Sequence, residues 1–437
     1  MFRAPALAAA MMLAALPALG ENRIDGQRPD APALAAYGAL PVGVRTIEIV
    51  DEGRVNIVAI DPAAPKPDPL PTYDRALTVE VWYPAAEGAT GETSFPALIR
   101  DGKTTVTLHG RAMRDAAPGT GRWPLVIVSH GYPGNRYLLS HLAENIASKG
   151  YVVASIDHRD STYEDRTAFG STLYNRPFDQ LFTLNEMERL GGDPASFLNG
   201  IVDPSNTGLV GYSMGGYGAV ITAGGGVTQT SVDYAWGTPH GTLAVHLSGS
   251  ESHATMPDPR FRTVIAFAPW GLTRAFWDAE TLKGVKLPIL YVAGSVDDVS
   301  GYSPGVRTMW EASTGVDRAL LTFDNANHNA AAPYPAPAEG REVDPDLGFA
   351  PFDHYADPVW DTVRMNNIAQ HFATAWLDAH LKGDAEATTY LELVPNANEG
   401  VWAMNEDGTP KPEHTHWKGF QNRTAKGLRY ETLKARE

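Results

Sequence analysis

The sequence predicts an α/β domain in which helices flank a mostly parallel central sheet. Residues 124–128 and 151–157 are continuous apolar runs, and the stretch between them has apolar residues at helical spacing. A strand, a helix and a strand joined by short connections form a unit with parallel strands. Further short apolar runs, which predict more strands of this sheet, occur at 207–210, 263–268, 288–293 and 319–323.

Composition excludes several classes of partner and chemistry. The chain has 437 residues and a formal net charge of −16, with no run of basic residues. Such a charge repels nucleic-acid phosphates and anionic lipid headgroups, so we expect no nucleic-acid partner. Cysteine is absent. The chain therefore has no disulfide, no thiolate nucleophile and no cysteine-based zinc site.

The N-terminus has the pattern of an export signal. Arg3 gives a short positive region, residues 6–16 form an apolar run, and Ala18-Leu19-Gly20 is a small-x-small cleavage site. We expect a signal peptide at 1–20 and a periplasmic or extracellular mature protein. The apolar run is short for a membrane span, and no other stretch is long enough, so no stable span is expected.

The remaining segments follow in order. Residues 21–44, rich in proline, alanine and glycine, predict an extended N-terminal arm. Strand-like runs at 45–50, 55–60 and 77–83 predict antiparallel strands that open the sheet. A catalytic domain is expected at 45–382, ending in a long helix at about 358–381. Residues 383–437 form a polar C-terminal tail.

Two stretches predict lid-like insertions in this domain. Residues 158–206 contain polar stretches, many turn residues and one expected helix near 178–190. Residues 225–260 are irregular and rich in glycine, serine and histidine, and they are too long for an ordinary connection. Both segments are therefore candidates for a cover over the functional site.

Ser213 is the predicted nucleophile. The segment Gly211-Tyr212-Ser213-Met214-Gly215 follows the run 207–210 and precedes a helix-like stretch. A G-x-S-x-G turn between a strand and a helix is too tight for flanking side chains, so glycines lie there and the serine projects outward. The same pattern also occurs as an ordinary glycine-rich turn, so the assignment depends on the partners of the serine.

An acid and a histidine follow Ser213 in the chain order that this type of sheet requires. Asp297 and Asp298 come after the run 288–293, and His328 comes after the run 319–323. Aspartates are also common turn residues. The order along the chain favours one of the two as the triad acid, with Asp297 ahead of Asp298, and it favours His328 as the base.

A serine nucleophile also needs two backbone donors for the oxyanion. We expect the N–H of Met214, directly after the nucleophile, and the N–H of Tyr132. Tyr132 follows Gly131, which lets the backbone approach closely. This chemistry requires no cofactor and no metal ion.

Several stretches resemble the platelet-activating-factor acetylhydrolase and dienelactone-hydrolase-like branch of the α/β-hydrolases. The resemblance extends from about residue 38 to 382, and it implies an α/β-hydrolase fold and a serine hydrolase activity. The stretches are Ser129-His130-Gly131 and residues 41–45, 74–85, 147–153 and 156–160.

A second similarity is to bacterial cutinase-like polyester hydrolases. There, as here, the oxyanion loop carries a tyrosine, the elbow reads Ser-Met-Gly-Gly, and Ala-Pro-Trp follows the next strand, here at 268–270. This likeness implies that the rings of Tyr132 and Trp270 flank the acyl group. The long insertions and the missing disulfide favour a partly covered pocket for a small or lipid-like ester.

We therefore predict an exported serine ester hydrolase that acts through an acyl-enzyme on small or lipid-like esters. The alternatives are a polyester hydrolase or a serine peptidase of the same fold and, in another class, a non-catalytic exported lipid-binding protein. The joint presence of Ser213, Asp297 and His328 disfavours the last alternative, because binding requires none of them. The sequence leaves the ester specificity and the oligomeric state open.

Overall fold

The computed structural model describes residues 20–166, 168–234 and 237–436. The predicted signal peptide, 1–20, lies outside the described residues except for Gly20. The strands are β1 (Asn22–Arg23), β2 (Val42–Val55), β3 (Thr72–Pro84), β4 (Ser94–Leu98), β5 (Thr105–His109), β6 (Met113–Arg114), β7 (Trp123–Ser129), β8 (Val152–Asp157), β9 (Val202–Tyr212), β10 (Phe261–Phe267), β11 (Ile289–Gly294), β12 (Arg318–Phe323) and β13 (Leu428–Leu433).

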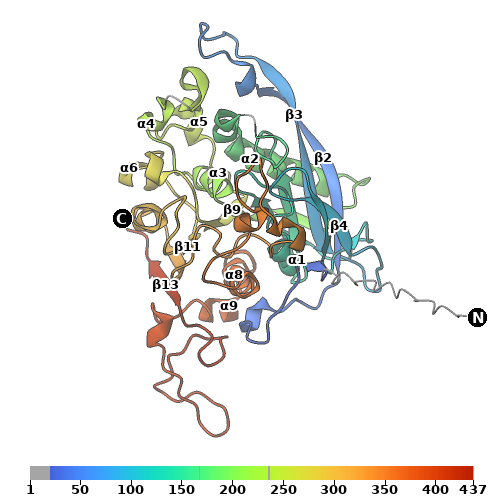
Figure 1. The fold of residues 1–437 in the computed structure, drawn as a ribbon, viewed down its shortest axis with the longest axis vertical. Helices are drawn as coiled ribbons and strands as arrows, with labels where there is room; N and C mark the ends of the chain where they lie inside the picture. Colours follow the sequence, from blue (N-terminus) through green and yellow to red (C-terminus); the bar gives the residue numbers. More distant parts are fainter. Residues whose placement is uncertain (1–19, 167, 235–236, 437) are drawn as a thin grey trace, which may run out of the picture.

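Within the described residues these strands form a ten-stranded sheet of order β13-β12-β11-β10-β9-β7-β8-β3-β2-β6 and a three-stranded sheet of order β1-β5-β4. Neighbouring strands from β8 through β7, β9, β10 and β11 to β12 are parallel. β2 and β3 form a long antiparallel pair towards one edge of the sheet, and β13 lies at the other edge (Figure 1). The predicted mostly parallel α/β sheet is confirmed.

The helices are α1 (Ser140–Ala147), α2 (Phe169–Gly192), α3 (Met214–Thr222), α4 (Gln229–Val232), α5 (Glu251–Ala254), α6 (Ala279–Leu282), α7 (Arg307–Ala312), α8 (Thr362–Leu377) and α9 (Ala385–Thr389). They cover both faces of the sheet. Val126 and Val128 of β7 lie in the core with α1 and α8, whereas Leu125 and Ile127 lie in the core with α2 and α3. Because alternate side chains of a strand point to opposite faces, a run that is buried on both sides is apolar throughout.

The segment 158–206 differs from the predicted lid. Its helix α2 packs against α3 and β9 and forms part of the helical layer between β8 and β9. Leu173, Leu184 and Met187 are buried in the core on that face. The sequence did not reveal this role because the same helix carries many polar residues. In the structure, many of these polar side chains are buried and not exposed to solvent.

The segment 225–260 lies beside α2. Within its described residues it contains α4, α5 and a 3₁₀ segment at Pro239–His246. Leu243 and Val232 reach the core on the α2 side of the sheet, and Nε2 of His246 lies 2.8 Å from the carbonyl oxygen of Tyr174 on α2.

The predicted strand at 55–60 is wrong. Ile57–Ala59 is a 3₁₀ turn, in which the side chain of Asn56 accepts a hydrogen bond from the N–H of Ala59. Ile57 and Ile60 are buried against Tyr174 of α2, so their spacing reflects a local apolar contact and not the pleat of a strand.

The tail beyond residue 382 takes part in the main sheet. β13 pairs with the whole length of β12, and Tyr430 stacks on Phe372 of α8 with ring centroids 5.2 Å apart. Among the helices of the described ranges, none combines the length and the apolar character that a membrane crossing requires.

Candidate active site

Ser213 lies in the sharp turn between β9 and α3. Its backbone has φ 53° and ψ −110°, a left-handed conformation that a non-glycine residue seldom adopts. The glycines on either side are required by close backbone contacts. A Cβ on Gly211 would lie 2.3 Å from the carbonyl oxygen of Gly215, and a Cβ on Gly215 would lie 1.9 Å from that of Ser129. The predicted elbow therefore has the geometry that exposes a serine side chain.

His328 links Ser213 to Asp297. Its Nε2 lies 3.0 Å from Oγ of Ser213, and its Nδ1 lies 3.0 Å from Oδ2 of Asp297. Asp297 follows β11 and His328 follows β12, so the carboxyl ends of parallel strands bring the three side chains together. The three residues are between 6% and 8% exposed.

Asp297, and not Asp298, faces the imidazole. Burial acts to raise the pKa of Asp297, but the hydrogen bond and charge of His328 and two backbone N–H groups hold this pKa below its ordinary value. The N–H groups belong to Val299 and Ser300 and lie 2.9 and 2.8 Å from Oδ1. An ionised Asp297 accepts a hydrogen bond from Nδ1–H, and this tautomer leaves the lone pair of Nε2 facing the hydroxyl of Ser213. Asp298 is exposed.

Met214 directly follows Ser213 in the chain, and Tyr132 lines the same cavity as Ser213. Met214 is the first residue of α3, where N–H groups have no acceptor within the helix. Within the described part of the chain, neither N–H donates a hydrogen bond to another residue. A pair of uncommitted donors at this position suits a developing oxyanion.

A cavity of about 250 Å³ opens at Ser213. Ser213, His328 and Tyr132 are among its lining residues. Arg100, from the turn after β4, also lines it, as do Phe349 and His354. The described lining of the cavity therefore combines a serine, aromatic rings, an arginine and the two carboxylates of Asp298 and Asp353.

An aromatic side chain that the sequence did not reveal lies next to the cavity. Phe169, at the start of α2, packs edge-on against both Tyr132 and Trp270, with ring centroids 5.2 and 5.4 Å apart. Phe169 thus contacts both of the rings that were predicted to bind the substrate, Tyr132 and Trp270. The backbone N–H of Trp270 donates a hydrogen bond of 3.1 Å to the carbonyl oxygen of Ser213, so this cluster is tied to the elbow.

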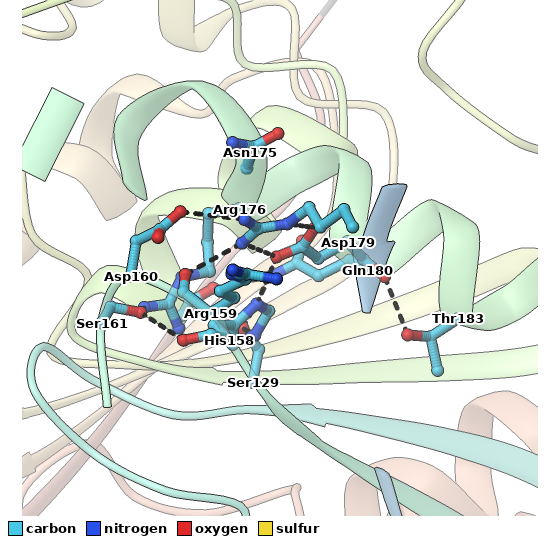
Figure 2. A network of polar contacts seen from close by, with 12 residues as sticks. Ser129, His158, Arg159, Asp160, Ser161, Asn175, Arg176, Asp179, Gln180 and Thr183 are labelled. Carbon is cyan, nitrogen blue, oxygen red and sulfur yellow. Dashed lines mark hydrogen bonds and ion pairs between the residues drawn. The ribbon is translucent and has the colours of Figure 1, made fainter. Parts of the chain in front are cut away.

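The chain contains a second Ser-His-Asp arrangement (Figure 2). Gln180 connects it to the backbone of the elbow at Gly215. Oγ of Ser129 lies 2.8 Å from Nε2 of His158, and Nδ1 of His158 lies 3.0 Å from Oδ2 of Asp179. Unlike Ser213, these three side chains are at most 1% exposed. Burial lowers the pKa of His158 to about 3, so its ring is neutral.

An ion pair fixes the acid of this second arrangement. Burial acts to raise the pKa of Asp179, but the charge and hydrogen bonds of Arg75, together with the hydrogen bond of His158, hold it well below its ordinary value. Arg75 donates to both carboxylate oxygens of Asp179, at 2.8 and 2.9 Å, and to Asp160 at 2.9 Å. Such a network is typical of a satisfied polar core.

Two further residues of α2 connect this network to the backbone of the elbow and the oxyanion loop. Gln180 donates to Oγ of Ser129 at 3.0 Å and to the carbonyl oxygen of Gly215 at 3.1 Å. Arg176 donates to the carbonyl oxygen of His130, two residues before Tyr132. α2 therefore holds both backbone segments that carry the free N–H groups.

Comparisons with known proteins agree with this architecture. Residues 72–176 match the family described as platelet-activating factor acetylhydrolase, isoform II. "Cutinase 2" of Thermobifida cellulosilytica is 23% identical over 64% of this chain and 77% of that protein. A "Cutinase" of Thermobifida fusca is also 23% identical, over 64% of this chain and 63% of its own length. The chain thus spans less than two thirds of the second relative.

A solved structure shares the fold. The ferulic acid esterase from Streptomyces cinnamoneus aligns with 84% of this chain and 94% of its own, at a TM-score of 0.51 and 21% identity. At this identity the likeness concerns the fold. The chain thus shares the fold of this esterase, and its residues 72–176 match the platelet-activating factor acetylhydrolase isoform II family.

Proposed function

We propose that the protein is a serine ester hydrolase that acts on small or lipid-like carboxylic esters through a Ser213-His328-Asp297 triad. The observation that carries the proposal is the 3.0 Å contact between Oγ of Ser213 and Nε2 of His328 at an elbow that opens on a cavity. The cutinases and the acetylhydrolase family named above support ester hydrolysis as the reaction.

In the first half of the reaction, Oγ of Ser213 attacks the ester carbonyl while Nε2 of His328 takes the hydroxyl proton. The negative charge that develops on the carbonyl oxygen is stabilised by the N–H groups of Tyr132 and Met214. Asp297 keeps the imidazole in place and stabilises its positive charge. His328 then gives the proton to the leaving alcohol, and the acyl group remains on Ser213.

In the second half, His328 removes a proton from water, and the resulting nucleophile attacks the acyl-enzyme. The oxyanion forms again at the same two N–H groups. Collapse of this intermediate releases the carboxylic acid and returns the proton to Oγ of Ser213. Ester, water, acid and alcohol balance, so the cycle needs no cofactor.

The cavity volume of about 250 Å³ supports small esters, or the reacting end of a longer one, as substrates. A polyester chain would need an extended surface groove for its flanking units. For this reason we rank a cutinase-like polyester hydrolase second. The similarity to the cutinases supports this second proposal.

Turnover of p-nitrophenyl esters from acetate to decanoate tests the proposal, with Ser213→Ala measured in parallel. We expect turnover by the wild type alone, and the chain-length profile separates short-chain from lipid-like preference. A folded wild type that is inert on every ester and retains a bound lipid would overturn the triad assignment in favour of a lipid-binding protein.

We also propose that the protein is exported, on the basis of the N-terminal pattern at 1–20. Mass spectrometry of the chain recovered from the periplasm or the culture medium tests this proposal. A mature N-terminus near Glu21 in either fraction supports it, and an uncleaved chain confined to the cytoplasm contradicts it.

A further inference from the structure

Arg100 lies in the wall of the Ser213 cavity and forms no ion pair with a described residue. It follows β4 and is partly buried. Its Nη1 is buried and has no hydrogen-bond partner among the described residues. A buried guanidinium nitrogen without a partner is costly, because it loses its contact with water and gains none in return.

Two other buried arginines, Arg75 and Arg318, are fully bonded. Arg75 donates from all three guanidinium nitrogens, to Asp179, Asp160, Tyr73 and a backbone carbonyl. Arg318 likewise donates from all three nitrogens, to backbone carbonyl oxygens. Arg176, which is also buried, leaves its Nε without a partner in the described part of the chain, but both of its terminal nitrogens donate, to the carbonyl oxygen of His130 and to Ser161. Arg100 differs because its open nitrogen is the terminal Nη1 and because the side chain lines the cavity.

Among the described residues, no carboxylate forms an ion pair with Arg100. Burial and the nearby positive charge of Arg166 both lower the pKa of Arg100. The cation also lies 5.5 Å from the ring centroid of Phe349. Asp298 and Asp353 line the same cavity, but both are exposed and neither forms an ion pair with Arg100.

A second open donor lines the same cavity. Nε2 of His354 is buried and has no hydrogen-bond partner within the described ranges. Burial lowers the pKa of His354 to about 3, so the ring is neutral and can donate one N–H. Tyr163 and Tyr355 pack edge-on against this ring, with centroids 5.5 and 5.1 Å away, and fix its position.

We propose that the esters hydrolysed at Ser213 carry an anionic group, a carboxylate or a phosphate, that binds Arg100 with His354 as a second donor. This inference rests on the proposed ester hydrolysis and names its substrate class. A guanidinium fork matches the oxygens of a carboxylate or phosphate, and the partly buried site strengthens the attraction. The overall charge of −16 repels anions. The positive charge of Arg100 attracts them locally.

Pairs of esters that differ in one charge test the inference. On the acyl side, mono-p-nitrophenyl succinate is compared with p-nitrophenyl butyrate. On the alcohol side, 4-acetoxyphenyl phosphate is compared with 4-acetoxyanisole. The background rate of each ester is subtracted with the Ser213→Ala variant, and the readout is the ratio of kcat/KM for the anionic over the neutral ester at low salt.

We expect the ratio to favour the anion in at least one pair, and to fall by about tenfold or more in Arg100→Gln, mainly through KM. Arg100→Lys should recover part of the ratio, because it keeps the charge and loses the fork. Arg262→Gln, at an exposed arginine near the start of β10, is the matched control and should keep the wild-type ratio. The pair that responds identifies carboxylate or phosphate as the bound group.

A ratio that Arg100→Gln leaves unchanged, while neutral esters are hydrolysed, overturns the inference and leaves the proposed function standing. If no ester is hydrolysed, the proposed function fails and the anion site is tested by binding alone. In that case, calorimetry compares the affinity of Ser213→Ala for the succinate ester with and without Arg100→Gln. Equal affinities then reject the site. Thermal unfolding of each variant verifies that it is folded.

Discussion

The hydroxyl oxygen of Ser129 lies 2.8 Å from Nε2 of His158, closer than the 3.0 Å between Ser213 and Nε2 of His328. Distance alone therefore does not identify the nucleophile, because both serines have a histidine in reach and an aspartate behind it. Burial separates them. Ser129 is fully buried and accepts a hydrogen bond from Gln180, whereas Ser213 borders the cavity.

We predict that a fluorophosphonate probe labels Ser213 and not Ser129. Ser213→Ala should lose the label and lower kcat/KM for p-nitrophenyl esters by roughly 10⁴-fold or more, because the attacking oxygen is gone. Labelling followed by peptide mass spectrometry identifies the modified serine directly.

Ser129→Ala is the matched variant. It should keep the label and cost about 1–3 kcal/mol of unfolding free energy, because the amide of Gln180 and the ring of His158 lose a buried partner. Urea unfolding measures this cost. Loss of labelling in a folded Ser129→Ala variant would instead assign catalysis to the deeper arrangement.

Asp297 and Asp298 should differ sharply on substitution. Asp297→Asn removes the charge that sets the proton on Nδ1 of His328, so we expect kcat to fall by about 10⁴-fold. Asp298→Asn is the control with the same chemical change one residue away, and it should lower kcat only slightly because this side chain is exposed. Steady-state kinetics on one ester suffices, and equal losses in the two variants would contradict the assignment.

The sequence was most informative where one residue type has one physical use. Continuous apolar runs such as 124–128 predicted the parallel strands, because only a strand buried on both faces needs apolar residues at every position. The glycines around Ser213 predicted the elbow, because the backbone contacts there leave no room for a Cβ. The chain order predicted Ser213, His328 and one of Asp297 and Asp298 as partners, and the structure places Asp297 on the imidazole.

The sequence was least informative where polar residues are buried. The polar face of α2 resembles the surface of a lid, and only the fold shows that Asp179 and Gln180 are hydrogen-bonded in the interior. Phe169 gave no periodic signal, since it is a single ring at the start of a helix. The sequence also carried no signal for Arg100, because only the fold places the turn after β4 at the cavity.

Removal of one ring from the C-terminal strand should destabilise the whole domain. Tyr430 is 2% exposed and stacks on Phe372. We expect Tyr430→Ala to lower the free energy of unfolding by about 3–5 kcal/mol, because a large buried side chain leaves a cavity. Lys434→Ala, on a side chain 87% exposed, is the control and should change it by no more than about 0.5 kcal/mol. Similar urea midpoints for the two variants would show that β13 contributes little.

Acid should destabilise the fold through buried neutral histidines. Burial lowers the pKa to about 3 or 4 for a set of five, namely His141, His158, His246, His354 and His371. The unfolded chain protonates each ring near pH 6.5. Between about pH 6.5 and these lower values it therefore binds protons that the folded chain does not. The free energy of unfolding must then fall as the pH is lowered, by up to about 1.4 kcal/mol per pH unit for each ring.

His141 on α1 isolates one of these contributions. Both of its ring nitrogens are buried without a hydrogen-bond partner in the described part of the chain, and burial alone lowers its pKa to about 3. We expect His141→Leu to reduce the slope of unfolding free energy against pH, between about pH 4 and 6, by about 1.4 kcal/mol per unit. His141→Gln removes the same titration with a different shape, so both variants should show the flatter slope in urea unfolding. A flatter slope in only one of them would assign the effect to packing instead of protonation.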